Sequence, residues 1–583
     1  MQRSKRSEAQ ASDRCLRANL RDRFQSLTMH RIRRFFDTHQ REAGWVGIAV
    51  LACLLVWFTH AQLAAVGDWR VDDAYITFSF SKNLATGHGP TFSHGVRVEG
   101  YSNFLWMLVM AVGYVFRHDL AAYGAARVLS VILLALMAVG VWRLCRRRAG
   151  WVASAAVLLV LAHSTDLARA TMSGLETVPY AAVLTLATVW YLEESPDRPW
   201  RWSLFGFVLV ALMRIDGFVP LLYVIGFELV ESHAAKRLHW RRFATWLAPV
   251  LVYAAWFVWQ WRYYGLPLPT TYYAKTLVDA DDPYRASTYA WDFVRALGLQ
   301  ALLPFALIAV ARRPARDTVF VALLVVGHGA YVLQTGGDWM PFWRFFIPVL
   351  PLVMVLAAWG LSEAWRTCRS LPAWTRAVPA LVAGWCCVFS ARHADATTVD
   401  TPQERAVLGL AAAVTAHTHD NLLASRAMMR AIVRSPGDRL VTDYGGVFGL
   451  YTDASVIEMW GLCNADIALH GGRDGITPVY GKSCPKCVAD AAPDYFHTMI
   501  PLQRSAGAFK NIDEVVKAVF LGTLLAKYID FRKEFAVGRV RDTAAGRALW
   551  FLERRRPNIA LVPRDAQPGL VVDYPFESGG TRP

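Results

Sequence analysis

The sequence lacks the signatures of several large enzyme classes. It contains no P-loop, no glycine fingerprint for a dinucleotide and no Gly-x-Ser-x-Gly elbow, so it does not favour nucleotide-driven, dinucleotide-dependent or serine-hydrolase chemistry. No spacing of His and Cys residues is typical of a zinc site, and we find no internal repeat and no low-complexity tract. An active site in this chain would therefore combine residues that are distant in the sequence.

The chain is instead rich in hydrophobic residues, which make up 55% of its 583 residues, and its mean hydropathy is +0.26. This composition is too apolar for a soluble protein of this size and is typical of an α-helical polytopic membrane protein. Because roughly 20 apolar residues cross a hydrocarbon core of about 30 Å, we predict eleven transmembrane segments. They are 43–66, 121–145, 150–163, 177–193, 202–213, 217–231, 245–261, 293–311, 317–334, 342–361 and 378–391.

The formal net charge is +16, and eleven Lys and Arg residues fall within residues 1–42. A basic cytoplasmic tail explains this charge better than a nucleic-acid partner does. We expect 43–66 to be an uncleaved signal anchor that keeps the N-terminus inside, so that 67–120 becomes the first external loop. Lys and Arg are more frequent in the loops that this orientation places inside, provided that 101–116 is a juxtamembrane or re-entrant helix and not a span.

Eleven crossings within 43–391 place residues 392–583 outside the cytoplasm as a separate domain. Its sequence predicts a mixed α/β fold, with strands at 439–446 and 455–460 and an amphipathic helix at 511–533. The region also contains polar loops between these elements. We therefore expect a helical membrane module followed by an α/β extracytoplasmic domain.

Three of the nine cysteines lie in this C-terminal region, namely Cys463, Cys484 and Cys487. In an extracytoplasmic domain a disulfide is expected in preference to zinc, because Cys484 and Cys487 have no second ligand pair at metal spacing. The sequence leaves open which two of the three cysteines pair.

Three polar clusters interrupt the hydrophobic segments, at 71–75, 173–177 and 336–340. If the segments alternate across a bilayer, all three clusters lie on the same, external face. Each cluster contains at least one carboxylate, and the second and third also contain glycine. This arrangement is typical of a membrane enzyme that assembles its active site from distant loops.

The adjacent carboxylates Asp72 and Asp73 are the first candidates for chemistry. Two neighbouring acids can raise one another's pKa or share a cation, which suits a general base or a metal ligand, although a solvated loop face is the alternative. The same loop also contains polar and aromatic groups that suit a carbohydrate, because sugars need paired hydrogen-bond partners and stack on rings. These groups are His94, Glu99, Tyr101 and Asn103.

The segments 72–78, 83–89 and 98–106 resemble the first external loop of bacterial GT-C glycosyltransferases. The similarity is greatest to the mycobacterial terminal β-1,2-arabinofuranosyltransferase group and its proteobacterial relatives, and it covers most of residues 45–470. Further matching stretches are 173–177, 263–269, 272–275, 336–346, 443–446 and 460–462. The chain has Arg214-Ile215-Asp216-Gly217 where relatives often have Arg-Pro-Glu-Gly, so the acid is shorter by one methylene.

The resemblance implies a GT-C fold and an inverting enzyme of the bacterial plasma membrane. It would move a single sugar, with arabinofuranose favoured, from a polyprenyl-phosphate donor to a hydroxyl acceptor on a cell-envelope glycan, glycolipid or protein. The acceptor hydroxyl needs a carboxylate to take its proton. We expect Asp72 to be this base and Asp73 to support it or to bind an optional divalent cation, and no other cofactor is implied.

The leaving phosphate needs cationic groups at the membrane edge. Lys275 and Arg344 are the candidates, although interfacial anchoring explains such residues equally well. Glu176 and Asp338 are expected to bind the sugar or the acceptor, with helix N-capping as the alternative. Asp216 and Trp339 complete this predicted set.

Two other functions remain open. A glycan ligase or phosphotransferase could use the same loops with a lipid-linked donor. A lipid or sugar transporter agrees less well with the sequence, because transporters place ionisable groups at mid-membrane and often contain repeats.

Overall fold

The computed structural model describes most of the chain after residue 45, in two compact units that comprise Met1–Ala61 and Gln62–Pro583. The predicted basic tail 1–42 and the predicted boundary near residue 392 lie outside the described residues. These are 46–67, 70–93, 95–117, 121–198, 200–236, 240–276, 283–312, 314–338, 342–367, 381–382, 384–385, 388–389, 430, 432–443, 445–472, 482–497, 509–518, 522–542, 547–557, 561, 564–567 and 570–576.

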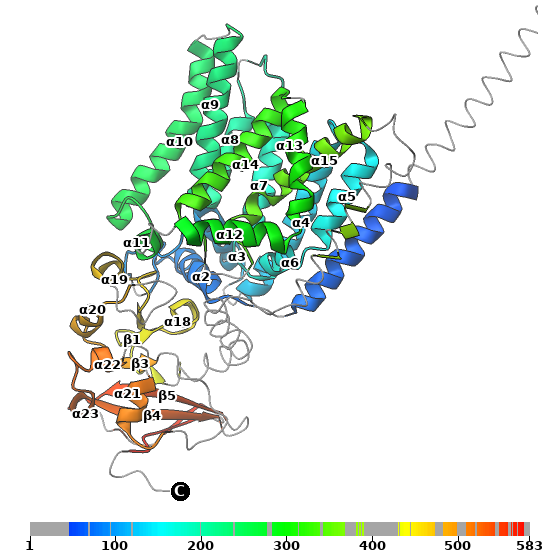
Figure 1. Cartoon of the computed structure of the whole chain (residues 1–583). Coiled ribbons are helices and arrows are strands. Elements are labelled where there is room, and N and C mark those ends of the chain that lie inside the picture. The colour runs from blue at the N-terminus through cyan, green and yellow to red at the C-terminus, as the bar shows by residue number, and fades with distance from the viewer. Residues whose placement is uncertain are drawn as a thin grey trace, which may run out of the picture. The chain divides into compact units, whose positions relative to one another are not determined.

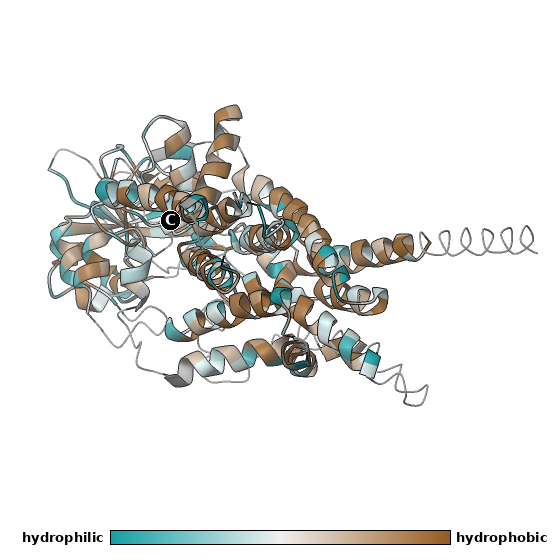
Figure 2. Ribbon diagram, turned by 90° about the horizontal axis from the view of Figure 1, so that it is seen from above, coloured by the Kyte–Doolittle hydropathy of each residue, from teal (hydrophilic) through white to brown (hydrophobic). Residues whose placement is uncertain are grey.

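The first part of the second unit is helical (Figure 1). Its α-helices are α2 Asp72–Ala85, α3 Phe104–Phe116, α4 Ala122–Arg146, α5 Trp151–Ala162, α6 Thr165–Met172, α7 Thr177–Glu193, α8 Ser203–Met213, α9 Phe218–Ala234, α10 Trp240–Tyr264, α11 Thr270–Thr276, α12 Pro283–Ala296, α13 Leu303–Arg312, α14 Arg316–Gln334 and α15 Leu350–Thr367. Short 3-10 helices are η1 Ile215–Gly217, η2 Leu299–Ala301 and η3 Ile347–Val349. Long hydrophobic stretches run along these helices (Figure 2).

Five helices of the described residues are long and apolar enough to cross a membrane, and two bent helix pairs raise this number to seven if each pair is one span. The five are Val46–Val66, Ala122–Arg146, Arg241–Tyr264, Arg316–Gln334 and Ile347–Thr367. The pair Trp151–Ala162 and Thr165–Met172 bends by 57°, and the pair Ala286–Ala296 and Leu299–Arg312 bends by 80°. The number of eleven crossings stays a prediction, and most of the predicted span 378–391 lies outside the described residues.

The C-terminal part contains one seven-stranded mixed sheet, which confirms the predicted α/β character. The strand order is β2-β1-β3-β5-β4-β7-β6, where β1 pairs in parallel with β2 and β3 and the other pairs are antiparallel. The strands are β1 Arg439–Thr442, β2 Ser455–Glu458, β3 Tyr495–His497, β4 Phe535–Asp542, β5 Arg547–Arg554, β6 Arg564–Gln567 and β7 Leu570–Asp573. The helices before β4 are α18 Gly445–Tyr451, α19 Ala465–His470, α20 Pro485–Asp490, α21 Ile512–Ala518, α22 Gly522–Leu525 and α23 Phe531–Glu534.

The single amphipathic helix predicted at 511–533 is wrong, because this stretch forms the three short helices α21, α22 and α23. Asp530 starts the last of them, since its side chain accepts a hydrogen bond of 3.2 Å from the amide of Lys533. The apolar residues of all three helices are buried in one cluster with the sheet. Packing on the sheet therefore outweighs the helical periodicity of the sequence.

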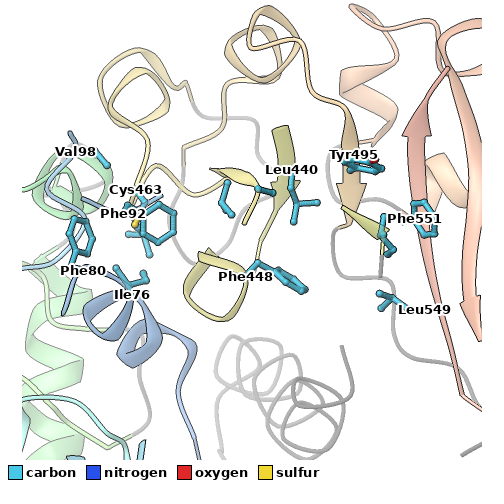
Figure 3. Packing of buried hydrophobic residues seen from close by; sticks show 14 of the residues in the cluster. Ile76, Phe80, Phe92, Val98, Leu440, Phe448, Cys463, Tyr495, Leu549 and Phe551 are labelled. Atoms are coloured by element: carbon cyan, nitrogen blue, oxygen red, sulfur yellow. The ribbon is translucent and has the colours of Figure 1, made fainter. Parts of the chain in front are cut away.

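The sheet and the first loop share a hydrophobic core (Figure 3). Ile76 and Phe80 of α2 and Phe92 of the following loop are buried in the same cluster as Leu440 of β1 and Phe448 of α18. Burial of a large apolar side chain contributes about 1.5–3 kcal/mol. The sheet part is thus held against the loop that contains Asp72 and Asp73.

Two of the three candidate cysteines form a disulfide, Cys484–Cys487. Cys463 is free and buried. It packs against Gly100, where a Cβ atom would lie 2.3 Å from its sulfur. The pairing that the sequence left open is therefore between the two closely spaced cysteines.

A neutral ionic network is buried where α7 ends and α8 begins. Arg201 pairs with Glu228 at 2.8 Å and with Glu194 at 3.2 Å, and Arg242 reaches Glu228 at 3.4 Å. All four side chains are at most 3% exposed. Because each charge is compensated, this network joins α7, α8, α9 and α10 without leaving a net charge among them.

Candidate functional site

Asp72 lies in the first turn of α2, where the helix dipole favours an acid, and it contacts the sheet part directly. Its carboxylate accepts hydrogen bonds from the amides of Gly446 at 3.0 Å and Val447 at 2.9 Å. A Cβ atom at Gly446 would lie 2.1 Å from the backbone oxygen of Asp72, so only glycine permits this approach of α18 to α2. Burial raises the pKa of Asp72 to about 7, although the hydrogen bonds from the amides of Val447 and Gly446 act to lower it.

Asp73 is joined to the third polar cluster through Arg344. The guanidinium lies 3.4 Å from Asp73 and also pairs with Asp338, with one contact at 3.2 Å. Trp343, the residue before Arg344, has a φ of 54°, a left-handed conformation that side chains other than glycine rarely adopt. The side chains of Arg344 and Asp338 are 7% and 2% exposed, so this ion pair is largely shielded from water.

Glu176 belongs to a second buried ionic group, which Arg214 organises. Arg214 reaches Glu176 at 2.7 Å and Asp216 at 2.8 Å. Asn103 donates to the other oxygen of Glu176 at 2.6 Å and exchanges a hydrogen bond of 3.1 Å with Thr77 of α2. Glu176 occupies the N-cap position of α7 but makes no capping bond with its side chain. Glu176 is therefore the N-cap residue by position, while its carboxylate pairs with Arg214 and Asn103.

The hydroxyl of Tyr123 of α4 forms hydrogen bonds with both the first and the second polar cluster. The amide of Val71 donates to the Tyr123 hydroxyl at 2.6 Å, and that hydroxyl donates to the carbonyl of Ser173. Gly174 has a φ of 75°, and a Cβ atom there would lie 2.9 Å from the Tyr123 ring and 3.2 Å from the side chain of Ala74. The glycine of the second cluster is thus required both for its turn and for its contact with α2.

The two ionic groups meet at the ring of Phe345. The guanidinium of Arg214 lies 5.1 Å from the ring centre and that of Arg344 lies 5.5 Å from it. Tyr289 also contacts this region, because its ring packs 5.3 Å from that of Trp343. The structure therefore brings the acidic turns of all three predicted clusters to one place.

Glu99 and Tyr101 hold the first loop against α10 and are both buried. Gln260 of α10 donates to Glu99, and the hydroxyls of Tyr101 and Tyr264 are 3.1 Å apart. Burial raises the pKa of Glu99 to about 8. Neither side chain faces solvent, and contact of either with a sugar stays a prediction.

Glu458 of β2 is a buried carboxylate beside this site that the sequence did not single out. It accepts hydrogen bonds from the amides of Trp460 at 2.7 Å and Leu462 at 2.6 Å, and Gly445 packs against its side chain. Burial raises the pKa of Glu458 to about 8. The predicted strand 455–460 contains Glu458, and the matching stretch 460–462 follows it, but neither marked its carboxylate as part of a site. Arg214 was missed as well, although it stands in the quoted Arg214-Ile215-Asp216-Gly217 motif.

Three predicted site positions cannot be placed in this arrangement. His94 and Trp339 lie outside the described residues, and so does the side chain of Lys275. Lys275 itself is on α11, whose first residue, Thr270, donates its amide to the carbonyl of Glu99 at 3.0 Å. This bond places the start of α11 beside the first loop.

Asp72 and Asp73 do not fit a divalent cation well. Both oxygens of Asp72 accept amide hydrogen bonds, and Asp73 already faces the guanidinium of Arg344. Within the described parts of the chain, no group of three or more His, Cys, Asp or Glu residues could hold a metal ion. Hard cations such as Mg²⁺ need several free oxygen ligands, and these two carboxylates already use theirs for amides and a guanidinium.

Comparison with known proteins finds similar curated and solved proteins, while no family model matches the chain. The terminal beta-(1->2)-arabinofuranosyltransferase of Mycobacterium tuberculosis is 26% identical over 366 residues, covering 55% of this chain and 56% of that protein. The chain thus matches little more than half of this relative's length.

ArnT from Cupriavidus metallidurans, solved with bound undecaprenyl phosphate, aligns with a TM-score of 0.51 at 13% identity over 87% of this chain and 98% of ArnT. Arabinofuranosyltransferase AftD from Mycobacteria aligns with a TM-score of 0.43 at 14% identity over 88% of this chain and 40% of that protein. The likeness to ArnT confirms the predicted GT-C fold, and the curated match confirms the resemblance to the arabinofuranosyltransferase group.

Proposed function

We propose that this protein is an inverting membrane glycosyltransferase that moves a single sugar from a polyprenyl-phosphate donor to a hydroxyl acceptor. The observation that carries this proposal is the convergence of Asp73, Asp338 and Glu176 on two arginines at one end of the apolar helices. Carboxylates for proton transfer and guanidinium groups for a phosphate are the two requirements of the reaction. The similarity to an arabinofuranosyltransferase favours arabinofuranose as the sugar.

The geometry supports Asp73 as the general base more than Asp72, which the sequence had favoured. Asp72 uses both oxygens to hold the amides of Gly446 and Val447, so its main role is to dock the sheet part. Asp73 pairs with Arg344 through one oxygen, and its side chain is 18% exposed. A base must lie within hydrogen-bond distance of the hydroxyl that it deprotonates.

In the proposed reaction the acceptor oxygen attacks the anomeric carbon as Asp73 takes its proton. The bond from that carbon to the phosphate oxygen breaks, and polyprenyl phosphate leaves with the electron pair. Arg344 would stabilise the charge that develops on the phosphate. Because carboxylates outnumber arginines among the described groups of the site, more positive charge is needed there, and Lys275 on α11 is the residue that we propose supplies it.

The orientation with the site outside the cytoplasm remains part of this proposal. A lipid-linked donor suits such a site, because nucleotide sugars stay in the cytoplasm. Each CH₂ of the polyprenyl tail that is buried in the membrane contributes about 0.8 kcal/mol, which holds the phosphate at the level of the loops. The acceptor would be a hydroxyl of a cell-envelope glycan, a glycolipid or a protein.

The proposal is tested with purified protein and a panel of polyprenyl-phosphate sugars. We expect one donor to be consumed, with polyprenyl monophosphate as the lipid product and one sugar added to the acceptor. Transfer of a whole glycan with release of pyrophosphate would indicate a ligase. Sugar transport into proteoliposomes without any transfer would indicate a transporter, and either result would replace the proposal.

The assignment of the base is tested by comparing Asp73→Asn with Asp72→Asn. Asparagine keeps the size of the side chain but cannot accept the proton, so we expect Asp73→Asn to lower kcat by about 100-fold or more. Asp72→Asn retains an oxygen for one amide and should lose much less activity. If Asp72→Asn is the slower variant, the role of base returns to Asp72.

A further inference from the structure

Three buried polar side chains lie near Arg214 in the helical part, and Asp216 pairs with Arg214 directly at 2.8 Å. Tyr180 comes from α7, Asp216 from η1 and His328 from α14, and their exposed fractions are 0%, 1% and 0%. The rings of Tyr180 and His328 have centres 6.2 Å apart. The guanidinium of Arg214 lies 6.0 Å from the centre of the Tyr180 ring.

Each of the three side chains has a polar atom without a partner among the described residues. These atoms are the Tyr180 hydroxyl, Oδ2 of Asp216 and Nδ1 of His328. Buried polar atoms are almost always hydrogen-bonded, because an unpaired one loses its contacts with water and gains nothing in return. Because Asp216 and the Tyr180 ring both lie near Arg214, and the Tyr180 ring lies near that of His328, three such atoms on these side chains indicate that a ligand completes them.

The hydrogen bonding of His328 defines what this ligand must offer. Its Nε2 lies 2.7 Å from the carbonyl of Phe345, which can only accept, so Nε2 carries the proton. In a neutral imidazole Nδ1 is then an acceptor. Oδ2 of Asp216 is an acceptor as well, so the ligand must donate at least two hydrogen bonds.

The groups nearby make a metal ion or an anion an unfavourable ligand. Arg214 lies 2.8 Å from Asp216 and disfavours a metal ion in the same place. Two unpaired acceptors disfavour an anion, so the phosphate does not belong here. A neutral group with several hydroxyls satisfies both acceptors, and the Tyr180 hydroxyl can pair with it as donor or acceptor.

We propose that Tyr180, Asp216 and His328 bind hydroxyl groups of the donor sugar and determine which sugar is transferred. This assignment rests on the proposed function. It is consistent with the position of the three groups, because Arg214 joins Asp216 to Glu176, and Phe345 joins Arg214 to Arg344. The sugar would thus lie beside the groups that act on its anomeric bond.

The test uses Tyr180→Phe with farnesyl-phosphate arabinofuranose and its 2-, 3- and 5-deoxy forms. The substitution removes one oxygen and keeps the ring. We expect kcat/KM for the parent donor to fall by about 10- to 100-fold, because a site built to bind a hydroxyl discriminates strongly when that contact is lost. For the deoxy donor that lacks the hydroxyl bound by Tyr180, the wild type and the variant should have the same kcat/KM.

Two further variants sharpen the test. Tyr331→Phe is the matched control, because Tyr331 is on α14 with its ring centre 6.3 Å from that of His328, but it is only half-buried. It should leave every kcat/KM unchanged. His328→Gln should weaken discrimination at a second sugar position.

The possible failures can be told apart. If the wild-type protein transfers none of the sugars in the full panel, the proposed function fails and this assignment fails with it. If the wild type is active and Tyr180→Phe lowers kcat/KM equally for all four donors, or for none, the three groups bind only water and this assignment alone is wrong.

Discussion

The pair of Arg344 and Asp338 allows the structural and chemical roles of one arginine to be separated. Their side chains are 7% and 2% exposed, and Asp73 lies 3.4 Å from the same guanidinium. Arg344→Met removes the charge and leaves Asp338 buried without its partner. Removing one member of a buried ion pair costs about 3–5 kcal/mol, and losing a cation that stabilises the departing phosphate lowers kcat by about 100-fold or more.

The double variant Arg344→Met/Asp338→Asn separates these effects. Because it also removes the uncompensated carboxylate charge, we expect most of the lost stability to return while the activity stays low. Stability is measured by thermal unfolding in detergent and activity by transfer of a single sugar. The reasoning is refuted if Arg344→Met unfolds like the wild type, or if the double variant regains the activity as well.

Three other predictions concern the first loop and its contacts. The pKa of Asp72 is raised from about 3.9 in an unfolded chain to about 7 in the folded protein. Because the folded protein holds this proton more tightly, the contribution of Asp72 to the free energy of unfolding is fully present below about pH 4. It is lost as the pH rises through about 7. Asp72→Asn should abolish this part of the pH dependence of unfolding. Gly446→Ala should lower stability through the contact at 2.1 Å with Asp72, whereas Gly437→Ala, where a Cβ atom meets nothing within 4 Å, should not. Removal of divalent cations with EDTA should leave transfer activity unchanged, because Arg344 is proposed to stabilise the leaving phosphate. If EDTA abolishes the activity and Mg²⁺ or Mn²⁺ restores it, a metal ion has this role instead.

Much of the fold could be predicted from the sequence because it follows from local patterns. Apolar runs identify helices such as α4 and α14, and short apolar runs bounded by polar residues identify β1 and β2. The three acidic clusters were also visible, since polar residues at the break between two apolar segments stand out from their surroundings. Ionic pairing was not visible, because no sequence pattern indicates that Arg214 contacts Glu176, 38 positions away.

The order of apolar and polar residues is enough to predict a chain of apolar helices, with carboxylates at their connections and a mixed α/β region at its end. The partners of each carboxylate depend on contacts between segments that are far apart in the chain. Asp72 and Asp73 are neighbours of the same type, yet α18 binds the first through its backbone amides and Arg344 pairs with the second. The same holds for the stretch 511–533, where burial against the sheet divides a helical pattern into three pieces. The physical reason is common to both cases: long-range packing and charge pairing contribute several kcal/mol at single sites, more than the local preferences that a sequence displays.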